Sequence, residues 1–282
     1  MHITTDDGAR LLAESAGDPA SPLLVALHGA PGLGSHLDTS RSFGRLAHSL
    51  RVVTYDARGC GASSLTPPYT HERWAADVDC VRAWAGAERF VLAGGSYGGF
   101  IALEYALRHP ERVSALVLRD TAAHNGFDAA ARRNALASPR IQVDLGMFER
   151  IFSGRVRDDS DLEACWRHIV PLYDHDPDPA RVEARLGNTV YHAQTHNAAF
   201  AECQPHYDLR AALPSLRVPV LVTVGRHDWI TPVAASEEIA GLVPGARLVV
   251  FEESGHSPHT EEPERFDATV LGFLRDVGVL PG

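Results

Sequence analysis

The sequence contains no lysine, so all 26 of its basic residues are arginine. This absence excludes Schiff-base catalysis, a Ser–Lys dyad and the phosphate-binding loop that ends in Gly-Lys-Ser or Gly-Lys-Thr, because each of them needs a lysine amine. Cysteine is scarce as well. Cys60, Cys80, Cys165 and Cys203 form no Cys-x-x-Cys pair, and the sequence therefore predicts neither a disulfide framework nor a thiolate zinc site.

Long apolar runs and an excess of positive charge are also missing. No run approaches the roughly 20 apolar residues that span a bilayer, and the opening MHITTDDGARLLAES lacks the basic and apolar regions of a secretory signal. The formal net charge of −10 argues against binding to nucleic acid or to anionic membranes. We therefore expect a cytoplasmic protein without nucleic-acid or membrane partners, and we make no prediction of its oligomeric state.

Short apolar runs alternate with helical patterns over much of the chain. Such runs, apolar on both faces, are typical of buried parallel strands joined by crossover helices. The chain of 282 residues is 45% hydrophobic, enough for a large core. The sequence therefore predicts an α/β protein with a doubly wound, mostly parallel sheet. The predicted strands are Leu23 to Leu27, Val52 to Tyr55, Phe90 to Ala93, Ala115 to Leu118, Pro219 to Val224 and Leu248 to Phe251.

The strand-like runs stop between residues 122 and 212, where helical patterns replace them. Ser160-x-x-Glu163 is typical of a capping box, and Asp178-Pro179 of a helix start. We predict a helical cap over residues 122–212, inserted into a core formed by residues 1–121 and 213–282.

Glycines crowd around one serine in LAGGSYGG, residues 92–99. The pattern Gly94-x-Ser96-x-Gly98 stands between a predicted strand and a predicted helix, which is the context of a nucleophilic serine on a sharp turn. Such a serine needs an imidazole that accepts its proton and an acid that orients the imidazole, in the chain order serine, acid, histidine. Loops after two later strands supply Asp228 and His256.

Other residues compete for these two roles. His227 and His259 lie beside the chosen residues, and Asp120 follows an earlier strand from which it could supply the acid. An oxyanion hole needs two further backbone N–H groups. We assign one to Tyr97, which follows the serine, and the other to Ala30 in the turn after the first buried strand.

Three motifs resemble a known family. HGAPG (28–32), DARGCGAS (56–63) and GGSYGG (94–99) resemble the H-G-G-P-G, D-x-R-G-x-G-x-S and G-G-S-x-G-[GS] motifs of the proline iminopeptidase group of serine peptidases, within the α/β-hydrolase superfamily. Ala30 replaces the usual middle glycine, and Tyr97 replaces a common tryptophan. The resemblance implies an α/β-hydrolase fold with a cap, and a cap carboxylate that holds the free amine of the substrate. Glu202 is our candidate for that carboxylate.

We accordingly expect a serine hydrolase that cleaves an amide bond of a short peptide or small molecule after an N-terminal proline or similar small residue. An ester or lactone hydrolase is the alternative, and a non-hydrolytic ligand-binding protein of the same fold is a third hypothesis. Trp229, beside Asp228, is a further candidate for substrate contact, although packing is the favoured interpretation.

We predict neither a cofactor nor a metal. His192 and His196 are four residues apart, but no third ligand is evident nearby. Arg58 is expected to tie loops together through carbonyl and carboxylate groups rather than to bind substrate.

Overall fold

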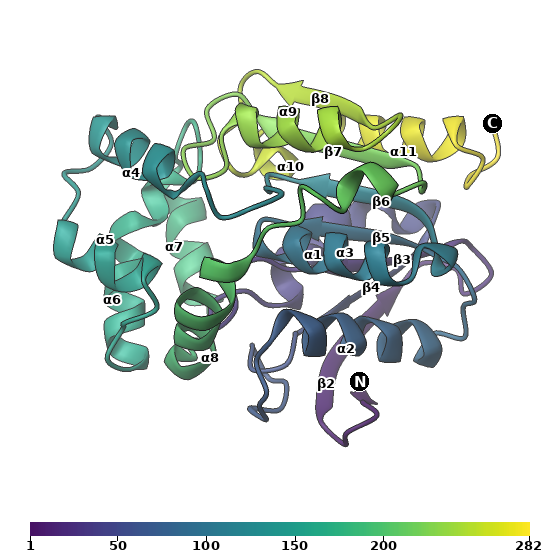
Figure 1. Ribbon diagram of the computed structural model, residues 1–282, viewed down its shortest axis with the longest axis horizontal. Coiled ribbons are helices and arrows are strands. Elements are labelled where there is room, and N and C mark those ends of the chain that lie inside the picture. Colours follow the sequence, from purple (N-terminus) through teal and green to yellow (C-terminus); the bar gives the residue numbers. More distant parts are fainter.

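A single eight-stranded sheet forms the centre of the computed structural model, which describes residues 1–282 (Figure 1). The strand order is β1-β2-β4-β3-β5-β6-β7-β8, and the strands from β4 to β8 in that order run parallel. The predicted doubly wound, mostly parallel sheet is confirmed. The strands are β1 (His2–Thr4), β2 (Arg10–Ala16), β3 (Leu23–Leu27), β4 (Arg51–Tyr55), β5 (Phe90–Gly95), β6 (Val113–Arg119), β7 (Val220–Gly225) and β8 (Arg247–Phe251).

The antiparallel strands β1 and β2 at one edge were not predicted. The segment of β2, RLLAESA, is rich in residues that favour helices, so its local preference does not indicate a strand. It becomes a strand because its backbone pairs with Arg51–Tyr55 in a register that sets Ala13 opposite Tyr55.

Helices cover both faces of the sheet. Alternate side chains of β3 enter different cores: Val25 packs on the side of α2, α3 and α9, whereas Leu24 packs on the side of α1 and α11. This two-sided burial explains why the strands read as continuous apolar runs. These helices are α1 (His36–Phe43), α2 (His71–Trp84), α3 (Tyr97–Arg108), α9 (Val233–Leu242), the short α10 (Pro258–Glu261) and α11 (Pro263–Asp276).

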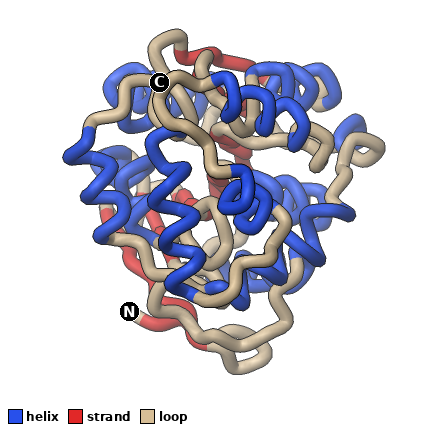
Figure 2. The backbone as a smooth tube through the Cα atoms, turned by 90° about the vertical axis from the view of Figure 1, so that its left-hand side faces the viewer, coloured by secondary structure: helices blue, strands red, loops and turns tan.

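Five helices lie between β6 and β7 in the chain and gather at one end of the sheet, in teal and green in Figure 1. Figure 2 views the molecule from that end and shows helices in front of the strands. They enclose a separate apolar cluster that includes Ile151, Leu162 and Ile169. The boundaries of a cap at 122 and 212 stay a prediction. The helices are α4 (Asp128–Ala137), α5 (Leu145–Phe152), α6 (Asp159–Ile169), α7 (Pro179–Gly187) and α8 (Ala193–Asn197).

Two predicted helix starts have different outcomes. Asp178 caps α7 through a hydrogen bond from Ala180 N–H, with Pro179 in the first turn, as predicted. The capping box at Ser160 is wrong, because α6 already begins at Asp159. The N-cap is Asp158, two residues before the predicted Ser160. Its carboxylate accepts the N–H of Asp161 at 2.8 Å and thereby satisfies a free donor of the first turn.

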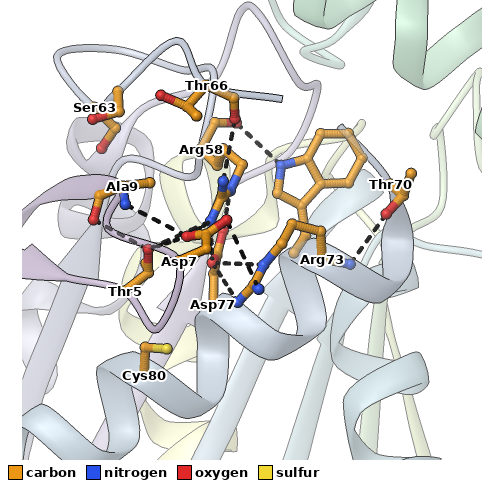
Figure 3. Close-up of polar contacts among 12 residues, drawn as sticks. Thr5, Asp7, Ala9, Arg58, Ser63, Thr66, Thr70, Arg73, Asp77 and Cys80 are labelled. Carbon is orange, nitrogen blue, oxygen red and sulfur yellow. Dashed lines mark hydrogen bonds and ion pairs between the residues drawn. The ribbon is translucent and has the colours of Figure 1, made fainter. Parts of the chain in front are cut away.

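Arg58 ties three segments together, as predicted. Its guanidinium is fully buried and donates two hydrogen bonds to Asp77 of α2, both at 2.9 Å, and one to Asp7 near the N-terminus at 2.7 Å (Figure 3). A further bond reaches the carbonyl of Thr66. Removing one partner would leave a buried charge uncompensated, which makes this network a structural requirement of the fold.

No helix of the structure combines the length and the apolar character needed to cross a bilayer.

Candidate active site

Ser96 stands on the turn between β5 and α3, with backbone angles φ 53° and ψ −126°. Only three non-glycine residues of the chain have positive φ, namely Ala30, Ser96 and Asp120. All three follow parallel strands, so they lie at the same edge of the sheet. Backbone conformations of this kind are costly and concentrate at functional sites.

The glycines beside Ser96 allow the turn to pack closely. A Cβ on Gly98 would lie 2.5 Å from the carbonyl oxygens of both Leu27 and His28, and a Cβ on Gly94 would collide with the carbonyl of Gly98. These contacts are with backbone atoms, which cannot move aside as a side chain does. The Gly-x-Ser-x-Gly pattern is therefore a requirement of close strand–helix packing.

His256 and Asp228 are joined by a hydrogen bond of 2.8 Å between Nδ1 and Oδ2. The other carboxylate oxygen of Asp228 accepts the N–H groups of Ile230 and Thr231, and the Thr231 hydroxyl donates to Oδ2 at 2.7 Å. The carboxylate is thus held in one orientation. No sequence pattern indicated that Thr231 would bind the carboxylate of Asp228.

The imidazole of His256 is anchored from its backbone. The backbone N–H of His256 donates to the carbonyl of Tyr173 at 2.6 Å, and the backbone carbonyl of His256 accepts from the guanidinium of Arg119 at 2.9 Å. Nε2 is buried and has no hydrogen-bond partner, and no hydrogen bond joins it to the hydroxyl of Ser96. Ser96 and His256 nevertheless line the same small pocket.

Asp120 lies close to this pair, and one ligand atom of each of Asp120, Asp228 and His256 falls within 4.8 Å of the others. Burial, together with the neighbouring charge of Asp228, raises the pKa of Asp120 to about 6. Its carboxylate accepts from the N–H of Gly225 and from Arg119, and it makes no hydrogen bond to His256. The hydrogen bond to His256 distinguishes Asp228 from Asp120, and the assignment of Asp228 as the acid stays a prediction.

The two competing histidines lie differently. His227 is exposed and stacks on His175, with ring centroids 3.6 Å apart. His259 is buried beside the small pocket, and burial lowers its pKa well below the usual range, which keeps it neutral. Neither ring contacts Asp228 through a hydrogen bond, so neither replaces His256 in this geometry.

Ala30 and Tyr97 are the two residues whose N–H groups we predicted to form the oxyanion hole. The N–H of Ala30 has no acceptor within the chain, and that of Tyr97 is the first of α3, which has no acceptor in the preceding turn. Both residues line the main cavity together with Ser96. The methyl group of Ala30 is accommodated at φ 35°. The two N–H groups remain predicted oxyanion donors.

The main cavity has a volume of about 470 Å³, and 16 of its 27 lining residues are hydrophobic, so most of the wall offers no hydrogen bond. One part of the wall comes from the sheet edge and the other from the helices before β7. The apolar lining from those helices includes Phe148, Ile151, Phe152, Trp166 and Ile169. A cavity of this size and character is typical of a small-molecule site.

Comparisons with known proteins agree with this arrangement. Residues 22–263 match the family described as alpha/beta hydrolase fold. The chain is 35% identical to a proline iminopeptidase, PfmaB, from Pestalotiopsis fici over 91% of this chain and 92% of that protein. It is 30% identical to a putative carbamate hydrolase, RutD, from a Caulobacter species over 97% of this chain and 98% of that protein. The chain belongs to the α/β-hydrolase family.

Solved structures of proteins named as a hydrolase and an esterase also resemble this α/β hydrolase. The structure of a thermophilic esterase from Thermogutta terrifontis superposes with a TM-score of 0.77 at 26% identity, covering 98% of both chains. The predicted resemblance to α/β hydrolases and to the proline iminopeptidase group is confirmed, and so is the prediction of a hydrolase enzyme.

Two predicted substrate contacts lie outside the cavity of the α/β hydrolase. Glu202 is exposed and does not line it, a position that does not fit a carboxylate touching bound substrate. Trp229 is buried behind the wall, where its ring packs edge-on against Phe152 and Tyr173 at centroid distances of 5.8 and 5.6 Å. Trp229 thus supports lining residues instead of touching the cavity.

His192 and His196 serve separate contacts. Nε2 of His192 lies 2.9 Å from the carbonyl of Gly61, and Nε2 of His196 lies 2.8 Å from that of Ile151. Burial lowers the pKa of His196 to about 4, so this ring is neutral. His192 thus contacts the loop at Gly61, and His196 joins α8 to α5.

Proposed function

We propose that the protein hydrolyses its substrate through an acyl-enzyme formed on Ser96, with His256 as general base and acid and Asp228 as the orienting acid. One observation carries this proposal. The hydrogen bond from His256 Nδ1 to Asp228 leaves Nε2 unpartnered and buried beside a pocket that Ser96 also lines. A neutral imidazole held in this tautomer is ready to accept the serine proton.

The reaction follows from these positions. Ser96 Oγ attacks the carbonyl carbon as its proton passes to His256 Nε2, and the N–H groups of Ala30 and Tyr97 donate to the resulting oxyanion. The imidazolium, stabilised by Asp228, then gives its proton to the departing amine or alcohol as the bond from the carbonyl carbon breaks. Water repeats the sequence and releases the acid product together with the free Ser96 hydroxyl.

The preferred substrate is an amide or short peptide with an N-terminal proline or similar small residue. The identity of 35% to a proline iminopeptidase over nine-tenths of the chain supports it. The free amine of such a substrate needs a carboxylate, and two of them line the cavity. Glu149 faces Arg132 at 3.6 Å, whereas Asp128 has only Gln204 as a hydrogen-bond partner, at 3.3 Å. We therefore assign the amine to Asp128 instead of Glu202.

An ester or lactone is the second candidate. The largely apolar wall of the cavity suits an uncharged acyl chain, and a solved esterase shares the fold at 26% identity. In this alternative the carboxylate of Asp128 has no part in binding.

Two assays test these candidates. Turnover of proline p-nitroanilide is compared with that of p-nitrophenyl acetate and butyrate, and Asp128→Asn should raise KM for the anilide alone. Strong ester turnover with none of the anilide removes the peptidase assignment and leaves the esterase.

A fluorophosphonate probe tests the nucleophile itself. It should label the wild type and the control Ser153→Ala, whose serine also lines the cavity, but not Ser96→Ala. Absence of label on the wild type would favour the third hypothesis, a ligand-binding protein without hydrolytic activity.

A further inference from the structure

A second pocket lies beside the nucleophile, and its character differs from that of the main cavity. It has a volume of about 100 Å³, and only 4 of its 14 lining residues are hydrophobic, against 16 of 27 in the main cavity. Ser96 lines both spaces, but His256 lines only the small one. The serine thus stands between a large apolar compartment and a small polar one.

The position of His256 decides which half of the substrate enters each compartment. In the proposed function, on which this inference rests, Nε2 of His256 delivers a proton to the leaving group, so the leaving atom must come within hydrogen-bond reach of that nitrogen. The leaving group therefore lies in the small pocket, and the acyl group extends into the large cavity. About 100 Å³ is the share of only a few water molecules in the liquid, so the pocket itself holds only a few non-hydrogen atoms of the leaving group.

Two guanidinium groups line the small pocket. The first belongs to Arg119, whose side chain is 10% exposed. Its Nη1 donates to the carboxylate of Asp120 and to the carbonyl of His256, while its Nε is buried without any acceptor. Nη2 makes no hydrogen bond with the chain and, unlike Nε, is not enclosed by it, so Nη2 is the donor that a ligand in the pocket can reach.

The second guanidinium belongs to Arg185 of α7. Only its Nη2 is used within the protein, in hydrogen bonds of 3.2 Å to Asp174 and 3.1 Å to the hydroxyl of Ser257. Nε and Nη1 make no hydrogen bond with the chain, although Arg185 lines the pocket. Free donors on a guanidinium match the geometry of a carboxylate.

The remaining charged group of the lining is Asp38, and it is already engaged. Its Oδ2 accepts the N–H of Ser35 in the capping box of α1, its Oδ1 lies 3.9 Å from Arg41, and its side chain is 42% exposed. His259 carries no charge there, because burial lowers its pKa well below the usual range. Arg119 and Arg185 therefore offer the guanidinium donors of the lining, while Trp166, His256 and His259 add ring nitrogens without a partner.

We propose that this pocket, formed around Arg119 and Arg185, binds a carboxylate on the leaving group. The substrates are then acyl derivatives of a small amino acid or hydroxy acid, of about the size of glycine or glycolate. In the first step the Ser96 Oγ–carbonyl bond forms, the bond to the leaving nitrogen or oxygen breaks, and His256 returns the serine proton to that atom. The leaving group departs with its carboxylate unchanged.

Matched substrate pairs test this proposal on either type of bond. Prolylglycine is compared with prolylglycinamide, and O-butyrylglycolate with O-butyrylglycolamide, so that each pair differs only in carboxylate against carboxamide. The wild type should prefer the carboxylate of each hydrolysed pair by about 10- to 100-fold in kcat/KM, as a charge-assisted hydrogen bond allows. Arg185→Gln should lose that preference through the carboxylate substrate alone, and Arg185→Lys should retain part of it.

The control is Arg181→Gln, which removes a guanidinium from the same helix. Arg181 lies 4.0 Å from the same Asp174 but lines neither space. This variant should behave as the wild type on all substrates. Equal rates on both members of a hydrolysed pair, or an equal loss on both in Arg185→Gln, would overturn the proposal.

A binding measurement separates this proposal from the catalytic one. Calorimetry on Ser96→Ala should show N-butyrylglycine binding at least about 10-fold more tightly than N-butyrylglycinamide. If that difference is present while the wild type hydrolyses no substrate, only the catalytic proposal fails. If the difference is absent, the carboxylate pocket fails, whatever the turnover.

Discussion

The loops at the sheet edge and the helices of the predicted cap contribute to the candidate site in different ways. Ser96, Asp228 and His256 are held by strained backbone, close glycine contacts and hydrogen bonds. The cap supplies mainly packed apolar side chains, such as Phe148 and Phe152, which touch one another without polar constraints. In the proposed function, reactivity is thus fixed by local geometry, whereas substrate selection depends on how separate helices pack.

Among the substitutions that test this difference between sheet edge and cap, Ser96→Ala should have the largest effect on activity. Removing the nucleophile should lower kcat/KM by about 10⁴-fold or more, because the remaining groups have nothing to activate. The thermal unfolding midpoint should stay close to that of the wild type. Initial rates on the best ester or anilide substrate give the measurement, with Ser153→Ala as the control on the cap side of the cavity. A residual rate within about ten-fold of the wild type contradicts the assignment.

The next effect separates the two acids of the sheet edge. Asp228→Asn should lower kcat by about 10⁴-fold, because an amide cannot hold the imidazole in the required tautomer. Asp120→Asn should lower it by about ten-fold or less, since Asp120 acts on His256 only through its charge.

The loss of rate caused by Asp120→Asn should depend on pH, because burial and the charge of Asp228 raise the pKa of Asp120 to about 6. Below that pH the carboxyl is protonated and uncharged like the asparagine, so wild type and Asp120→Asn should have similar rates at pH 5. Above it the ionised carboxylate stabilises the imidazolium of the transition state, and the wild type should become the faster enzyme. Rate profiles from pH 5 to 8 test this, and a larger loss for Asp120→Asn than for Asp228→Asn would exchange their roles.

A pair of glycine substitutions compares the rigidity of the two regions directly. Gly98→Ala should destabilise the fold by about 3 kcal/mol, because its Cβ would lie 2.5 Å from two backbone carbonyl oxygens. Gly187→Ala in α7 has open space around the added methyl, and it should change the free energy of unfolding by about 1 kcal/mol or less, toward greater stability. Denaturant unfolding of both variants gives the values. Similar losses in both would mean that the turn at Ser96 tolerates side chains.

The same contrast explains what the sequence could predict. The residues that make β3 a strand, and those that allow the Gly94–Gly98 turn, lie next to one another in the sequence. Apolar runs and glycine spacing therefore predicted both elements. The β1–β2 hairpin was missed, because β2 becomes a strand through pairing with β4, which its own sequence does not indicate.

Cap residues are harder to predict for a related reason. Asp128 of α4 lines the main cavity and Arg185 of α7 lines the small pocket, but no motif surrounds either residue. Glu202 shows the converse. It was chosen as a carboxylate of the right region, but on the π-helix Ala198–Cys203 its side chain does not line the cavity. The residue type and its region of the sequence did not predict where the side chain of Glu202 points or whether it lines the cavity.

The smallest effect should come from Phe152→Ala, which changes only the cap wall of the cavity. The ring of Phe152 packs against Phe148 at 4.6 Å and against Trp229 at 5.8 Å, so its removal opens space without touching Ser96. Each CH₂ group of a longer acyl chain that fills this space gains about 0.8 kcal/mol, or about four-fold in kcat/KM. Relative rates on p-nitrophenyl acetate, butyrate and hexanoate should therefore shift toward the longer esters, with acetate nearly unchanged. An equal loss on all three esters would show that the cap wall also positions the catalytic groups, and the division between reactive edge and selective cap would not hold.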